Sequence, residues 1–333
     1  MRIEWLDSLK GFAIFLVVVG HVVLGYIRAD IFPQYYNELQ YIYNIIYSFH
    51  MPLFFLISGF LYKLTWSKKN TGVFKKIGNK FLNMVPMYLV FSLTFWVFKY
   101  YATLYSNIQM SDYFNFIDLI HIYIAPLSYL WFLYALICLF IIIPLLESFI
   151  KPVLVFLVFF LLYVLAPHIE GIFKVVNSII YGGVYFSLGS ILFIYSEYIK
   201  NNIGNKLIIL SFISITIAYC SFPFINVYNI FKFICAISVS VFLSIIFFRL
   251  QNYKFISLWK PCGYYSLGIY ILHLYFTGPL RTIFKYLSID NIIIVSILAS
   301  IIGTLAPIFI VKLLARYKAT SWIFGETKLI KLE

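Results

Sequence analysis

The chain has 333 residues, of which 63% are hydrophobic, 21% aromatic and only 11% charged. About a quarter of the residues of a soluble protein are charged, and a disordered chain is poor in aromatic residues, so this composition excludes both classes and indicates a membrane protein. The formal net charge of +13 does not form one basic face, because Lys and Arg stand in short segments between apolar runs. We therefore expect no nucleic-acid partner.

Apolar runs long enough to cross a bilayer follow one another along the whole chain. A helix needs about 20 residues to cross roughly 30 Å of hydrocarbon. The runs lack the alternating pattern of a membrane β-barrel, and helices satisfy all of their own backbone hydrogen bonds in lipid. We predict an all-α, polytopic protein with about ten transmembrane helices, which form a single integral-membrane domain over residues 1–333. The predicted segments are 9–27, 42–64, 81–101, 128–146, 151–167, 175–195, 206–224, 228–248, 264–280 and 291–312.

The basic residues predict the orientation of these helices, because Lys and Arg concentrate in cytoplasmic loops. With the N-terminus inside, 19 of the 25 basic residues fall in inner segments and six in outer ones. Both termini are therefore expected in the cytoplasm. The four cysteines stand singly, so we expect no disulfide and no cysteine chemistry.

The first predicted helix carries ionisable residues that a membrane span does not normally tolerate. Lys10 and His21 are 11 positions apart, which places them within about 20° of each other around a helix. Asp7 lies three residues before Lys10 and close to the same face, so we expect an ion pair between them. The helical rise places His21 about 16 Å further along the helix than Lys10, near the middle of the membrane.

Two more histidines are expected at the same depth. The second segment is expected to enter from the outer side, and His50 lies about 12 Å from its start. The ninth is expected to enter from the cytoplasm, and His273 lies about 13 Å from its start. One interpretation is a functional cluster with His21, and the other is that each makes an ordinary hydrogen bond between packed helices. A metal site is a third possibility, but no carboxylate lies at this depth and no ligand pair has metal-binding spacing, so we expect no metal.

A basic patch follows the second predicted helix on the cytoplasmic side. Its functional interpretation is a site for a polyanionic cytoplasmic ligand such as a nucleotide-bearing cofactor. The alternative is that the charges only set the topology and contact anionic lipid. The patch consists of Lys68, Lys69, Lys75, Lys76 and Lys80.

Five motifs, in this order along nearly the whole chain, resemble acyltransferase family 3, integral-membrane enzymes that acetylate O-antigen, capsule, exopolysaccharide and other glycans. In the opening motif Lys10 stands where the family usually has Arg, which keeps the charge but loses bidentate contact. The motifs are Leu6-Asp7-Ser8-Leu9-Lys10-Gly11 with His21, Phe49-His50-Met51-Pro52-Leu53-Phe54-Phe55 with Ser58-Gly59, Lys76 to Lys80 before Pro86-Met87-Tyr88, Leu130-Trp131-Phe132-Leu133, and Tyr265 to His273.

The resemblance implies ten core helices and transfer of an acetyl or other small acyl group from cytoplasmic acetyl-CoA to a hydroxyl of a cell-surface or lipid-linked glycan. It places the protein in the bacterial cytoplasmic membrane, with acyl-CoA, the glycan and membrane lipid as partners. His21 would be the general base or a covalent nucleophile. The remaining expected roles are catalysis for Lys10 and Asp7, donor binding for Lys76, Lys80 and Lys69, and lining of the substrate site for His50, Ser58, Trp131 and His273.

Two competing functions remain open. In a transporter or glycan exporter the same histidines would couple transport to proton movement, although the inverted repeats of such folds are not evident in the sequence. A purely structural membrane subunit would not need Lys10 and His21 on one helix face.

Overall fold

The structure is a computed structural model, and it describes residues 3–67, 71–105, 116–165, 174–202, 204–220 and 229–316. Within these ranges every regular element is a helix and none is a strand. The chain divides into two compact units, Met1–Tyr47 with Leu89–Ile120 and Leu250–Glu333, and Ser48–Tyr88 with His121–Arg249. We call them unit 1 and unit 2 and describe each by itself. The expected single domain stays a prediction.

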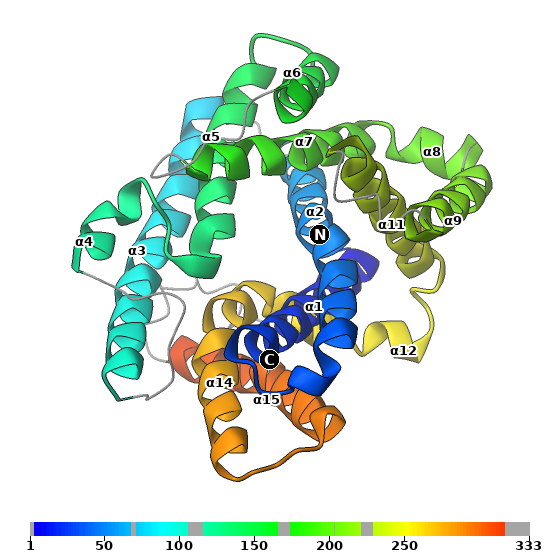
Figure 1. The fold of residues 1–333 in the computed structure, drawn as a ribbon. Helices are drawn as coiled ribbons and strands as arrows, with labels where there is room; N and C mark the ends of the chain where they lie inside the picture. Colours follow the sequence, from blue (N-terminus) through cyan, green and yellow to red (C-terminus); the bar gives the residue numbers. More distant parts are fainter. Residues whose placement is uncertain are drawn as a thin grey trace. The chain divides into compact units, whose positions relative to one another are not determined.

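Unit 1 is built around the N-terminal helix. Helix α1 packs against α12, α13, α14 and α15, and α14 runs beside α15 (Figure 1). The first part of α2 and the last part of α3 also belong to this unit. The bounds are α1 Glu4–Ala29, η1 Pro33–Tyr35, α2 Tyr36–Ser67, α3 Val73–Tyr105, α4 Phe116–Ile120, α12 Lys254–Ser257, α13 Lys260–Tyr264, α14 Ser266–Tyr286 and α15 Ile292–Ala315.

Unit 2 holds the rest of α2 and α3 and the middle of the chain. Helix α7 packs against α5 and α6, and α9 packs against α11. The bounds are η2 His121–Tyr123, η3 Ser128–Leu130, α5 Trp131–Glu147, α6 Pro152–Leu165, α7 Val175–Ile194, α8 Ser196–Asn202, α9 Gly204–Cys220 and α11 Asn229–Arg249.

Seven helical segments in the described part of the chain are long and apolar enough to cross a membrane. Within the described residues all ten predicted segments coincide with helices, so the all-helical membrane class is confirmed. The other three segments are α6 with 14 residues, α9 with 17, and α14, which carries His273, Arg281 and Lys285 among its apolar side chains. Ten crossings and cytoplasmic termini remain predictions. The seven are Glu4–Ala29, Pro33–Ser67, Val73–Ala102, His121–Glu147, Val175–Ile194, Ile230–Arg249 and Ile292–Ala315.

Charged residues at the two ends of α1 have the signs that the helix dipole favours. Glu4 and Asp7 lie in its first turn, where acidic side chains favour the helix dipole, and Arg28 lies in its last. Asp30 ends the helix in the left-handed conformation, with φ of 47°, and its N–H caps backbone carbonyls of the last turn. The chain can therefore turn directly into α2.

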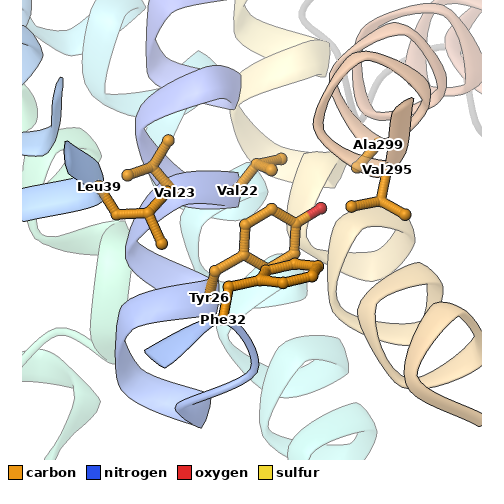
Figure 2. Close-up of a cluster of buried hydrophobic side chains, with 7 residues drawn as sticks. All are labelled: Val22, Val23, Tyr26, Phe32, Leu39, Val295 and Ala299. Atoms are coloured by element: carbon orange, nitrogen blue, oxygen red, sulfur yellow. The ribbon is translucent and has the colours of Figure 1, made fainter. Parts of the chain in front are cut away.

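A buried apolar cluster joins the second half of α1 to the start of α2 and to α15 (Figure 2). The rings of Tyr26 and Phe32 meet edge to face, with centroids 5.3 Å apart. Because lipid tails are as apolar as these side chains, close packing and not the exclusion of water holds such helices together. The cluster consists of Val22, Val23, Tyr26, Phe32, Leu39, Val295 and Ala299.

The first half of α1 touches α13 backbone to backbone. A Cβ atom at Gly11 would overlap the carbonyl oxygen of Trp259, and one at Gly263 would overlap the carbonyl oxygen of Asp7. Only glycine permits this approach on both sides. The contact fixes the part of α1 that carries Asp7 and Lys10.

Gly11→Ala should therefore destabilise the protein by about 1–3 kcal/mol, because the added methyl group meets rigid backbone. Thermal unfolding in detergent, followed by size-exclusion fluorescence, measures the effect. Gly78→Ala is the matched control, since a Cβ at Gly78 meets nothing within 4 Å. Equal unfolding temperatures for the two variants would show that α1 and α13 are not in backbone contact.

Candidate active site

The predicted ion pair at the start of α1 is present. Lys10 Nζ lies 2.6 Å from Asp7 Oδ1, one helical turn away. Asp7 is 7% exposed and its second oxygen, Oδ2, has no hydrogen-bond partner among the described residues; the same holds for the hydroxyl of Ser8. Buried polar atoms normally have a hydrogen-bond partner. The free oxygen of Asp7 and the hydroxyl of Ser8 could therefore each bond to a further group at this end of α1.

The loop and short helix that cover this end of α1 were not predicted as part of the site. Lys260 on α13 forms a second ion pair, at 2.6 Å, with Glu4. The indole of Trp259 packs against the rings of Phe12 and Phe15, with centroids 5.3 Å away in both cases. These contacts hold α13 on α1 around the Asp7–Lys10 pair.

His21 and His273, two of the three histidines expected at one depth, lie next to each other. Their ring centroids are 5.0 Å apart, and the hydroxyl of Tyr47 lies 3.5 Å from His21 Nδ1. His21 is half-buried, whereas His273 is completely buried.

Hydrogen bonding determines the tautomer of His273. Its Nδ1 lies 2.7 Å from the carbonyl oxygen of Tyr270 and 3.1 Å from that of Ile269. A carbonyl only accepts, so Nδ1 carries the hydrogen, and in the neutral ring Nε2 is the acceptor. His273 is therefore held in one orientation by its own helix, beside His21.

Three other predicted residues, His50, Ser58 and Trp131, belong to unit 2. His50 is 1% exposed on α2, and Ser58 is half-buried two turns further along the same helix. The indole of Trp131, the first residue of α5, lies 6.2 Å from the ring of Phe55. Their roles in lining a substrate site stay predictions.

The lysines predicted to bind the donor lie near aromatic rings in unit 2. Lys76 donates a hydrogen bond of 2.8 Å to the carbonyl oxygen of Trp66 and lies 5.6 Å from the centroid of that indole. Lys80 lies 4.6 Å from the ring centroid of Phe140. Such contacts hold an ammonium group in place. Lys69, the third predicted donor residue, lies outside the described residues.

A buried carboxylate in unit 2 was missed by the sequence reasoning. Glu147, at the end of α5, forms an ion pair with Lys63 and accepts hydrogen bonds from Tyr62, at 3.0 Å, and Ser190, at 2.8 Å. Its side chain is only 6% exposed. The group therefore ties α5 to α2 and α7 through charge and hydrogen bonds in a low-dielectric setting.

A signal for this pair was available. Glu147 stands one residue beyond the predicted fourth segment, and Lys63 was counted only as an orientation charge at the end of the second. Under the predicted topology both ends face the cytoplasm, so opposite charges there can meet. Only the packing of the helices shows which of the many cytoplasmic lysines does so.

The described residues include no group of three or more His, Cys, Asp or Glu side chains that could hold a metal ion. In unit 1 the half-buried imidazole of His21 lies beside the imidazole of His273 and the phenol of Tyr47. The same helix carries the Lys10–Asp7 pair. An imidazole of this kind can accept a proton from a hydroxyl.

The helices and this site define a multi-pass membrane protein with ionisable groups among its apolar helices. The chain belongs to acyltransferase family 3: the family model described as an acyltransferase domain matches residues 3–314. The protein is thus a membrane acyltransferase, and the resemblance seen in its motifs is confirmed. No match was found among curated proteins or solved structures.

Glu147→Ala should destabilise the protein, because it leaves Lys63 without its counter-ion and removes the acceptor of two further hydrogen bonds. Lys63 is 24% exposed, so the loss should lie between the roughly 1 kcal/mol of an exposed pair and the 3–5 kcal/mol of a fully buried one. Thermal unfolding in detergent measures it. Glu4→Ala breaks an ion pair whose acid is 68% exposed and should cost less than about 1 kcal/mol. A loss of stability in Glu147→Ala no larger than that in Glu4→Ala would show that the Glu147–Lys63 pair does not hold the helices together.

Proposed function

We propose that the protein is an O-acetyltransferase of the bacterial cytoplasmic membrane, which moves an acetyl or other small acyl group from cytoplasmic acyl-CoA to a hydroxyl of a cell-surface or lipid-linked glycan. The observation that carries the proposal is the placement of His21 beside His273 and Tyr47, on the helix that also holds the Lys10–Asp7 pair. Membership in the acyltransferase family supplies the reaction class.

In the proposed reaction His21 takes the proton of the acceptor hydroxyl while the hydroxyl oxygen attacks the thioester carbonyl. The tetrahedral intermediate then collapses, the C–S bond breaks, and the departing thiolate receives the proton from His21, which gives the acetyl ester and free coenzyme A. Imidazole suits this task because its ordinary pKa lies near neutral pH. His273, fixed by its own helix, acts as a positioning residue for the His21 ring.

A second route passes through a covalent acyl-histidine. His21 would attack the thioester itself, release the thiolate, and pass the acyl group to the hydroxyl in a second step. Brief mixing of the enzyme with labelled acetyl-CoA in the absence of acceptor, followed by acid quench, separates the routes. Only the covalent route leaves label on His21.

The donor is proposed to enter from the cytoplasmic end. Lys76, Lys80 and Lys69 would meet the phosphates of coenzyme A, and the pantetheine arm would extend toward mid-membrane. Lys10 is proposed to act on the donor in unit 1. Asp7 fixes the position of the Lys10 ammonium group, 2.6 Å away. His50, Ser58 and Trp131 are proposed to line the path of the acyl group.

Proton-coupled export uses the same histidines in a different way. It predicts movement of a glycan or solute across the bilayer with no dependence on acyl-CoA. The acyltransferase assignment predicts release of free thiol from acetyl-CoA when an acceptor is present. The assay below therefore also separates these two functions.

His21→Ala should lower acetyl transfer by at least about a hundredfold, because a general base contributes roughly 10²–10⁴ to the rate. Purified protein in nanodiscs, labelled acetyl-CoA and a panel of candidate glycans provide the measurement, with free thiol and labelled ester both quantified. His121→Ala is the control, since His121 lies in η2 and has no proposed role. Retention of a tenth or more of wild-type transfer by a folded His21→Ala variant would rule out His21 as the base.

Replacing both Lys76 and Lys80 by Gln should raise KM for acetyl-CoA by about tenfold or more and leave KM for the acceptor unchanged, because two cations facing the donor phosphates are lost. The dependence of donor KM on salt should become shallower, since fewer ionic contacts remain to be screened. Donor titrations at low and high salt test this. If the lysines serve only topology, the correctly inserted double variant will keep its wild-type donor KM.

A further inference from the structure

One face of α14 carries polar residues that continue beyond His273. Thr277 and Arg281 follow His273 at intervals of four, so the three side chains stand one turn above another on one side of the helix. The hydroxyl of Thr277 is buried and has no hydrogen-bond partner among the described residues. The stripe leads from the histidine pair to Arg281, about 12 Å further along α14.

Arg281 sits beside α1 one turn beyond His21. Its Nη1 donates a 2.9 Å hydrogen bond to the carbonyl oxygen of Gly25, four residues after His21. This is about 6 Å further along α1, a distance similar to the length of one sugar ring. The guanidinium group and the histidine pair thus lie on the same interface of α1 with α14, within unit 1.

The charge of Arg281 is not balanced within the described part of the chain. None of the described carboxylates forms an ion pair with it, although Asp30, Glu38 and Asp290 belong to the same unit. Its Nε is buried and has no partner there. Arg28 lies close enough to act on it electrostatically, and that charge has the same sign. A guanidinium group has five N–H donors, and a poorly compensated cation among apolar helices is costly to keep without a partner.

Aromatic side chains flank the same region. Tyr43 and Tyr47 stand one turn apart on α2 with ring centroids 4.1 Å apart, and Tyr47 contacts His21. Arg28 lies close enough to both tyrosines for an electrostatic interaction. Tyrosine combines an apolar ring face with a hydroxyl, which suits the faces and hydroxyls of a sugar.

We propose that Arg281 binds a carboxylate or phosphate group of the acceptor, about one sugar ring from the hydroxyl that His21 deprotonates. The acceptor class is then an acidic glycan, in which a uronic acid or a sugar phosphate stands at or next to the acetylated residue. Guanidinium binds both oxyanions through paired N–H donors. The proposal rests on the acetyltransferase function above, because it assigns the charge of that reaction's acceptor.

Two other roles for Arg281 predict different results. It caps a carbonyl in the last turns of α1, which is a structural role without any ligand. Its guanidinium group can also meet the phosphate of an anionic lipid. The first experiment separates all three roles and needs no enzymatic activity.

The first experiment measures how fast phenylglyoxal, an arginine reagent, labels Arg281 in phosphatidylcholine nanodiscs. Mass spectrometry gives the labelling rate of each arginine, and a bound anion should slow the labelling of Arg281. The probes are trigalacturonic acid against its methyl ester, and glucose 6-phosphate against glucose, so that each pair differs in charge. We expect at least one charged probe to slow labelling of Arg281 several-fold, the neutral partners to have no effect, and exposed Arg316 to label equally throughout. Protection by neither charged probe overturns the proposal. Protection that appears only when phosphatidylglycerol is added assigns Arg281 to lipid and also overturns it.

The second experiment compares Arg281→Gln with Arg281→Lys in acetyl transfer to the charged and neutral acceptors of the first. Loss of the charge in Arg281→Gln should raise KM for the charged acceptor by at least about tenfold, which is about 1.4 kcal/mol, with less than a twofold change for the neutral one. Arg281→Lys should recover part of the charged-acceptor affinity. Equal losses for both acceptors, together with a lower unfolding temperature, would leave only the capping role.

The two proposals can fail separately. If a folded His21→Ala variant still transfers acetyl groups, the assigned base is wrong, while labelling of Arg281 still reports anion binding. If transfer requires His21 but does not distinguish charged from neutral acceptors, the enzyme assignment stands and the acidic acceptor is wrong.

Discussion

The contact of α1 with α13 and α14 determines where every candidate residue of unit 1 lies. At one end, Gly11 and Gly263 allow the two backbones to touch and enclose the Asp7–Lys10 pair. In the middle, His21 meets His273, and further along Arg281 bonds to the carbonyl oxygen of Gly25. Charged and polar groups in lipid must face protein, so a single helix interface that collects three such groups is where chemistry is expected.

This arrangement suits the transfer of a group between substrates that arrive from different sides. In the proposed reaction the donor meets cations near the start of α1 and the acceptor meets Arg281 near its end, with His21 between them. The rise of a helix places His21 about 16 Å from Lys10 along the axis. A thioester carried on a long flexible arm can cover that distance.

Unit 2 handles its charges in two different ways. Glu147 neutralises Lys63 and takes two more hydrogen bonds, so its polar groups satisfy one another. Lys76 and Lys80 instead lie near the rings of Trp66 and Phe140, which orient an ammonium group. The Glu147 group is suited to hold helices together.

The sequence by itself determined the class of the protein, the positions of its helices and the pairing of Asp7 with Lys10. Hydropathy and the geometry of one helix suffice for these, because they depend on neighbours along the chain. It also predicted one depth for His21, His50 and His273, which stays a prediction; the structure shows the rings of His21 and His273 side by side.

Tertiary structure alone decided the rest. That Lys63 is the partner of Glu147, that α13 covers the start of α1, and that Arg281 reaches Gly25 across 256 residues all depend on which helix faces meet. Helix faces in lipid are selected by close packing of small and large side chains, and that complementarity involves residues far apart in the chain. No local pattern encodes it, so these contacts emerged only when the helices were placed together.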